Sequence, residues 1–209
     1  MKNTLTFFGI ITFFVLIGFF LSACGDGGDN DEKTSIIGGY FTSNSLKITN
    51  ADVYDTEVDT VPITGNTYDG DYSDNITNYG FAGQVAKIQN GKLIVDLSVP
   101  TSDKLSSFQG ITGITVTPPT AKATAFMSFF NESKHKSIVL RKSSKVILFF
   151  FTDNNGSING TGDLLSQGAN QHFNNIILKK GWNALLYDRD TGNINNVTID
   201  SSFKWRGYW

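Results

Sequence analysis

The chain has little of what cross-links a fold or carries catalysis. Its 209 residues include one cysteine, two histidines and four prolines. A single cysteine excludes a disulfide within the chain, so the fold must be held by packing alone. His135 and His172 are too far apart in sequence to form the short histidine pair of a zinc site. We therefore expect no metal site and no catalytic cofactor.

Motifs of the common enzyme classes are also missing. The sequence has no Gly-x-Ser-x-Gly nucleophile elbow and no glycine-rich phosphate loop with its lysine. A Ser/His/Asp triad assembled from distant residues would leave no such motif, so a hydrolase remains the weakest of the readings. We predict a protein that is not an enzyme.

The N-terminus has the layout of a secretory signal peptide. Lys2 gives a positive start, and Leu5 to Phe20 is an apolar run without charge. The following Leu21-Ser22-Ala23-Cys24 resembles the lipobox of bacterial lipoproteins. That resemblance implies cleavage before Cys24, a diacylglycerol thioether on its sulfur and a further acyl chain, such as palmitate, on its amine. The alternative is an uncleaved membrane span, which needs roughly 20 apolar residues.

An acidic tether is expected between the lipid and the fold. Residues 25–34 read GDGGDNDEKT, in which glycine gives flexibility and acidic side chains favour solvation. The chain then divides into a signal peptide (1–23), a lipidated cysteine with its tether (24–34) and a β-rich domain (35–209). We expect an exported protein anchored in the outer membrane or at the cell surface, rather than in the inner membrane.

From Ser35 onward the apolar residues follow the period of β-strands. Residues 93–99 alternate between apolar and other side chains, and Asn90-Gly91 before them predicts a hairpin turn. Residues 123–130 and 146–151 are apolar at nearly every position, which is typical of strands covered on both faces.

Many short strands with recurring turns predict an all-β fold. The expected architecture is an antiparallel β-sandwich or a barrel-like arrangement. Pro118-Pro119 is the best internal boundary, and it is either a loop within one domain or a junction between two.

Charge is divided unevenly along the chain. Residues 24–104 hold 13 acidic and 5 basic side chains, whereas residues 105–209 hold 6 acidic and 11 basic ones. Five of the basic residues lie close together in sequence: Lys134, Lys136, Arg141, Lys142 and Lys145. They predict a surface that attracts a polyanion, such as a lipid headgroup or an acidic glycan. The alternative is that they pair with the acidic first half or form a solvated face.

The three tryptophans are a second candidate for ligand binding. Trp182, Trp205 and Trp209 all lie in the last 28 residues. Exposed tryptophan in a β-sandwich stacks on sugar rings, whereas buried tryptophan packs the core. The alternation that begins at Phe203 favours a closing strand with one buried face.

Residues Asp69 to Asn75 bring several oxygen ligands together. Calcium prefers such carboxylate and amide oxygens. The spacing does not match an EF-hand loop, and Asp, Asn and Gly are also ordinary turn residues. A turn is therefore the favoured reading, with a calcium site as the alternative.

The segment Ile176-Ile177-Leu178-Lys179-Lys180-Gly181-Trp182-Asn183 resembles a pattern in small β-rich lipoproteins of spirochaetes, especially treponemes. In that pattern an apolar strand runs into a Lys-Gly-Trp-Asn turn, another strand follows, and the chain ends in an aromatic strand. Residues 146–151 and 203–209 fit the same layout. The resemblance implies a surface or periplasmic lipoprotein without an assigned catalytic role.

We therefore expect a membrane-anchored, non-catalytic module that binds a ligand or acts as an adhesin. Its expected partners are membrane lipid through Cys24 and a glycan, a polyanion or a host protein. Nucleic acid is not expected, because the chain is net acidic and exported. The alternative is a passive structural component of the envelope, which predicts an evenly polar surface.

Overall fold

The structure is a computed structural model that describes residues 32–55, 69–74, 86–109, 111–164 and 170–208. The predicted signal peptide, Cys24 and most of the predicted tether lie outside these residues. Asp31–Trp209 forms one compact unit by its internal contacts.

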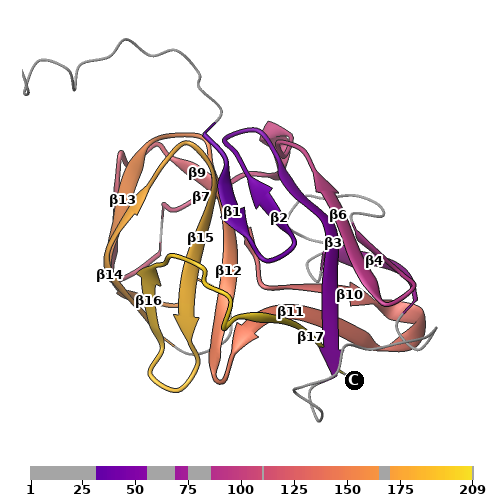
Figure 1. The fold of residues 1–209 in the computed structure, drawn as a ribbon. Coiled ribbons are helices and arrows are strands. Elements are labelled where there is room, and N and C mark those ends of the chain that lie inside the picture. The colour runs from indigo at the N-terminus through magenta and orange to yellow at the C-terminus, as the bar shows by residue number, and fades with distance from the viewer. Residues whose placement is uncertain (1–31, 56–68, 75–85, 110, 165–169, 209) are drawn as a thin grey trace, which may run out of the picture. The chain divides into compact units, whose positions relative to one another are not determined.

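The described residues form an all-β fold, as the sequence predicts (Figure 1). Two short 3₁₀ helices accompany the strands, η2 (Ser102–Lys104) and η3 (Glu132–Lys134). The strands are β1 (Thr34–Ile36), β2 (Gly39–Phe41), β3 (Leu46–Asp55), β4 (Gly70–Asp74), β5 (Ala86–Gln89), β6 (Lys92–Leu97), β7 (Ser106–Ser107), β8 (Ile114–Thr117), β9 (Lys122–Phe126), β10 (Ser128–Asn131), β11 (Lys136–Lys142), β12 (Lys145–Thr152), β13 (Gly156–Gly162), β14 (Gln171–Leu178), β15 (Gly181–Asp188), β16 (Asn193–Asn196) and β17 (Lys204–Tyr208).

The 17 strands join in one mixed sheet, which does not close into a barrel as a whole. Most neighbouring strands are antiparallel, and the parallel pairs are β14 with β16 and β3 with β17. Within the sheet, the pairings run in a circuit from β3 through β6, β5, β4, β10, β11 and β17 back to β3. The remaining long strands, β12 to β16, extend the sheet away from this circuit.

The predicted hairpin at Asn90-Gly91 is confirmed and joins β5 to β6. Both turn residues have positive φ, 54° for Asn90 and 72° for Gly91, as a tight two-residue turn requires. Gln89 is paired with Lys92 across the turn. The alternation in β6 buries Leu93 and its period-two neighbours on one face, which is what the sequence pattern predicts.

The run at 146–151 is confirmed as a strand covered on both faces. It forms most of β12, which pairs with β15 along its whole length and with β9 over its second half. Successive side chains of a strand point to opposite faces. Ile147, Phe149 and Phe151 therefore enter one hydrophobic core, while Leu148 and Phe150 enter another.

The two cores share β12 and β15 as their common wall. The first core lies between these strands and the strands of the circuit. The second lies between these strands and β13, β14 and β16. Pro118 and Pro119 form a turn between β8 and β9, and β8 pairs with β13 while β9 pairs with β12. The strands before and after this turn therefore belong to the same unit.

Candidate binding surface

Two of the candidate tryptophans are buried, which corrects the prediction of an exposed stacking surface. Trp182 is 3% exposed and Trp205 is 0% exposed, and both belong to the first core. The indole N–H of Trp205 donates to the carbonyl oxygen of Ile37 at 2.9 Å. Neither ring is accessible to a sugar. Trp209 lies outside the described residues.

Phenylalanines from the predicted buried strands surround these two indoles. The Phe149 ring stacks on Trp205 with centroids 6.0 Å apart and planes at 8°. Phe126 and Phe151 meet Trp182 edge-on, at 5.9 Å and 5.5 Å between centroids. Offset stacks and edge contacts of this kind stabilise a core beyond simple area burial. The tryptophans are therefore structural residues of the first core.

The five basic residues that are close together in sequence do not form one cluster, because they lie at the two opposite ends of β11. Lys134 and Lys136 lie at the start of this strand, while Arg141 and Lys142 lie at its end. Lys145 pairs with Lys142 across the two-residue turn to β12. At roughly 3.4 Å per residue, the two ends of β11 are about 20 Å apart. The sequence cluster is therefore two separate groups on the surface.

Lys134, at the start of β11, contacts the backbone of the acidic first half of the chain rather than one of its carboxylates. The Lys134 ammonium donates to the backbone carbonyl of Asp69. Nearby, the Asn131 amide donates to the carbonyl oxygen of Asp71 at 2.6 Å. These contacts tie Lys134 of η3 and Asn131 of β10 to the start of β4.

The group at the end of β11 gains two cations that lie far away in sequence. Lys204 of β17 is the cross-strand partner of Arg141. Arg189, which follows β15, donates its backbone N–H to the Ser144 carbonyl at 3.3 Å. We call this group the basic end; its members are Arg141, Lys142, Lys145, Arg189 and Lys204. No local sequence motif links Arg189 and Lys204 to the rest, and only the strand pairing brings them there.

Like charges repel one another in the basic end. Burial lowers the pKa of Arg141, and the positive charge of Arg189 lowers it further. Directly opposed like charges on paired strands, as at Arg141 and Lys204, are destabilising. The ammonium of Lys204 lies 4.3 Å above the ring of Tyr54, a cation–π contact that offsets part of this cost.

Carboxylates near the basic end accept hydrogen bonds from backbone N–H groups of their own turns. Asp188 accepts a hydrogen bond from the backbone N–H of Asp190 at 3.1 Å. Asp200 accepts one from the backbone N–H of Ser202 at 2.8 Å, and hydrogen bonds from Ser202 lower its pKa most, with a smaller effect of Lys142. Asp188 and Asp200 thus each cap a turn near the basic end.

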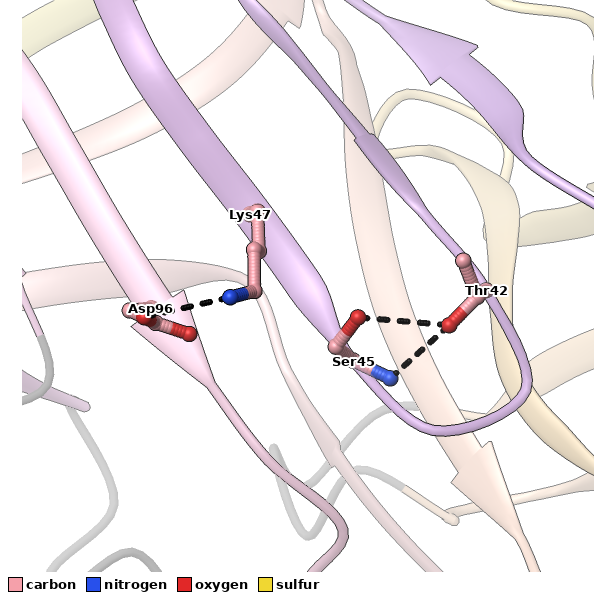
Figure 2. Close-up of polar contacts among 4 residues, drawn as sticks. All are labelled: Thr42, Ser45, Lys47 and Asp96. Atoms are coloured by element: carbon pink, nitrogen blue, oxygen red, sulfur yellow. Dashed lines mark hydrogen bonds and ion pairs between the residues drawn. The ribbon is translucent and has the colours of Figure 1, made fainter. Parts of the chain in front are cut away.

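Ion pairs found in the described residues lie elsewhere. Figure 2 shows Lys47 of β3 paired with Asp96 of β6 at 3.4 Å. Lys92 pairs with Asp52 on the same two strands. These pairs are local to the acidic first half. Within the part of the chain that the structure describes, no ion pair includes Lys142, Lys145 or Arg189.

Asp69 has a turn-capping role in the structure. Its carboxylate accepts the backbone N–H groups of Asn90 at 3.0 Å and Gly91 at 3.2 Å, and so holds the β5–β6 turn. Asn75 lies outside the described residues. In the described ranges, no group of three or more His, Cys, Asp or Glu side chains is placed to hold a metal ion.

Both histidines are exposed. Nδ1 of His172 lies 3.0 Å from the hydroxyl oxygen of Thr161, on the neighbouring strand β13. His135 follows η3 with a positive φ of 52°, at the turn into β11. The described partner of His172 is thus a hydroxyl rather than a carboxylate.

No family model, curated protein or solved structure matches this chain. Among the described residues, none of the helices has the length and apolar character needed to cross a membrane.

The chain enters the fold at the opposite end of β15 from the basic end. Lys179, just before β15, pairs with Glu32 at 3.4 Å, and Lys33 lies 4.7 Å from the ring of Tyr40. The first residue of β15, Gly181, touches the backbone of Ser43 in the β2–β3 turn. Figure 2 shows this turn held by Thr42, whose hydroxyl oxygen accepts the Ser45 N–H at 3.1 Å. We call this region the tether end; its members are Glu32, Lys33, Ser43, Lys179 and Gly181.

Proposed function

We propose that the protein is an exported lipoprotein, anchored through Cys24, whose β domain is a non-catalytic binding module. The observation that carries this proposal is the basic end. Four separate strands or their turns deliver cations to one place, although like charges there repel. A cluster of this kind is retained at a cost in stability, which an anionic ligand would offset.

Anchoring gives the domain its setting. β1 begins at Thr34, ten positions after Cys24. Two acyl chains give stable membrane attachment, since each buried methylene contributes about 0.8 kcal/mol. The proposed location is the outer membrane or the cell surface.

Intact-mass analysis of the membrane-extracted protein tests the anchor. We expect loss of residues 1–23 together with the added mass of acyl chains. A Cys24→Ala control should show neither the acyl mass nor cleavage at this bond. A full-length, unmodified mass for the wild-type protein would instead mean that the N-terminus is a membrane span.

The second candidate is a passive structural component of the envelope. It predicts charge spread evenly over the domain. The paired charges on β3 and β6 have that character, but the basic end does not. The binding module is therefore the reading that the geometry favours.

A further inference from the structure

We infer that the outer face of β8, β13, β14 and β16 is a binding site for a neutral polysaccharide. These strands are neighbours in that order, and their inner face packs on the second core. Figure 1 shows β13, β14 and β16 next to one another. We call the outer face the amide face; its central members are Asn159, Thr161, His172, Asn174, Asn175 and Asn195. The inference goes beyond the proposed function, because it concerns a different surface and a different class of ligand from the basic end.

Charged side chains are absent from all four strands of this face. The strands read ITVT, GSINGTG, QHFNNIIL and NINN, without Asp, Glu, Lys or Arg. By contrast, β3 and β6 carry charge pairs at their surface, such as Lys47 with Asp96. A face without charge has no group that attracts a polyanion or a cation. Its one large apolar side chain with high exposure, Ile177, is too little for a membrane-binding patch.

The amide face is built from a residue type that strands disfavour. Asparagine is depleted in strands, because its side chain competes for backbone hydrogen bonds. The asparagines of β13, β14 and β16 are Asn159, Asn174, Asn175, Asn193, Asn195 and Asn196. Asn196 supports the sheet, since its amide accepts the Ile177 N–H at 2.9 Å and donates to the Ile177 carbonyl at 2.8 Å. Asn174 and Asn195 bond to each other instead. A local preference broken without gain to the backbone ladder is typical of a functional site.

A β-bulge adds one more amide to this face. The pairing of β13 with β14 shifts between Ile158 and Gly160, so Asn159 is opposite both Asn174 and Asn175. Asn175 takes a positive φ of 49°, and both Asn174 and Asn175 are exposed. In a regular strand, one of two successive side chains would point inward. Bulges turn side chains in this way beside functional sites.

Hydrogen bonds between side chains order the amide face before a ligand arrives. The Asn174 amide donates to Oδ1 of Asn195 at 3.2 Å, which links β14 to β16. The Thr161 hydroxyl lies 3.0 Å from Nδ1 of His172, which links β13 to β14. An amide has two N–H donors and an oxygen with two lone pairs, so these contacts use only part of its capacity. Ordering of this kind lowers the entropy cost of binding.

A polysaccharide matches both the chemistry and the shape of the face. Sugar hydroxyls donate and accept hydrogen bonds, as amides and threonine hydroxyls do. Neighbouring strands are about 4.8 Å apart, so the four strands span about 14 Å. Small ligands bind in concave pockets, whereas the outer face of a sheet suits an extended chain of sugar units. Ile177, which is 63% exposed, offers an apolar contact for the C–H face of a sugar ring. Binding here does not need the buried tryptophans.

Substitution of the paired amides provides the test. In the detergent-extracted protein, we would combine Asn174→Ala with Asn195→Ala and measure binding to dextran, laminarin and galactomannan, three neutral polysaccharides, by calorimetry. The matched control is Gln89→Ala with Gln109→Ala, which removes two exposed amides outside the four strands. Thr161→Val is a second variant, because it removes a hydroxyl and keeps a β-branched side chain suited to a strand. Thermal unfolding checks that each variant is folded, and Thr161→Val decides the test if the paired variant is not.

We expect at least one of the three polysaccharides to bind the wild type. The paired variant should bind it about tenfold more weakly, and Thr161→Val about threefold, because each removes hydrogen bonds between neutral groups. The control variant should stay within about twofold of wild type. Binding should change little as salt is raised, since no charge in the four strands takes part.

Three results would overturn the inference. The first is that none of the three polysaccharides binds the wild type, and the second is equal weakening by the paired variant and its control. The third is a wild-type dimer that the paired variant dissociates, without polysaccharide binding, which would make a second copy of the chain the partner. None of these results depends on the basic end or on the acyl mass at Cys24, so this inference and the proposed function fail separately.

Discussion

At the scale of single residues, burial decides what an aromatic side chain does. Trp205 has no exposed surface, and its one polar atom is satisfied by the Ile37 carbonyl. Phe149 stacks against it and is 1% exposed. Such residues contribute through the apolar area removed from water and through tight packing, so their loss leaves a cavity.

Phe149→Ala should therefore be strongly destabilising. Removing a buried phenylalanine costs about 3–5 kcal/mol of unfolding free energy, because the stacked partner keeps its position and a cavity remains. Urea unfolding followed by far-UV circular dichroism measures the change. The matched control is Ile177→Ala, since Ile177 is 63% exposed and should change stability by less than about 0.5 kcal/mol. Equal effects of the two substitutions would contradict the placement of Phe149 in the core.

At the scale of elements, the turn before β15 gives two residues of the Lys-Gly-Trp-Asn segment a structural role. The Asn183 side chain accepts the Lys179 N–H at 3.0 Å and donates to the Lys179 carbonyl at 2.7 Å. Gly181 takes a φ of +100° and lies against the Ser43 backbone, where a Cβ would come within 2.3 Å of the carbonyl oxygen. The turn thus needs an amide at one position and no side chain at another.

Gly181→Ala should destabilise the fold by about 2–4 kcal/mol, through the strain of positive φ and the clash with Ser43. Thermal unfolding of the two proteins at one pH measures it. Gly192→Ala is the control: φ is also positive there, at +72°, but the nearest atom to a Cβ is the Asn170 carbonyl oxygen at 3.0 Å. If Gly181→Ala lowers stability no more than Gly192→Ala does, the β2–β3 turn can move to make room for the added methyl group.

Local pattern was enough to predict several of the strands. Period-two alternation predicted β6, Asn90-Gly91 predicted its hairpin, and a continuous apolar run predicted β12. Alternation also predicted one buried face for the closing strand, but it did not settle whether Trp205 lay on that face. The answer depends on Phe129 and Phe149, whose strands are remote in sequence.

The basic end was predicted only in part, for a similar reason. Arg141, Lys142 and Lys145 are neighbours in sequence, so a count of charges finds them. The same count adds Lys134 and Lys136, which lie at the opposite end of β11 from Arg141 and Lys142. It misses Arg189 and Lys204, since their place follows from the pairing of β15 and β17 with β12 and β11. Surface charge patterns depend on which strands pair over long sequence distances, and a local count of charges does not show that pairing.

At the scale of the whole unit, the two cores share a wall and should unfold together. Leu140 lies in the first core and Ile176 in the second, and both are 0% exposed. β12 and β15 contribute alternate side chains to the two cores, so loss of either core exposes one face of the same strands. Neither core can persist alone at full stability, because a sheet of this kind needs cover on both faces.

Calorimetry of the wild type should accordingly show one transition whose calorimetric and van't Hoff enthalpies agree. Leu140→Ala and Ile176→Ala should each lower that single midpoint, by an amount matching about 2–5 kcal/mol of lost stability. The exposed substitution Ile177→Ala is the control for the second variant. If the two variants split the transition, or each lowered a different midpoint, the cores would be separate folding units. That result would support a domain boundary at Pro118-Pro119.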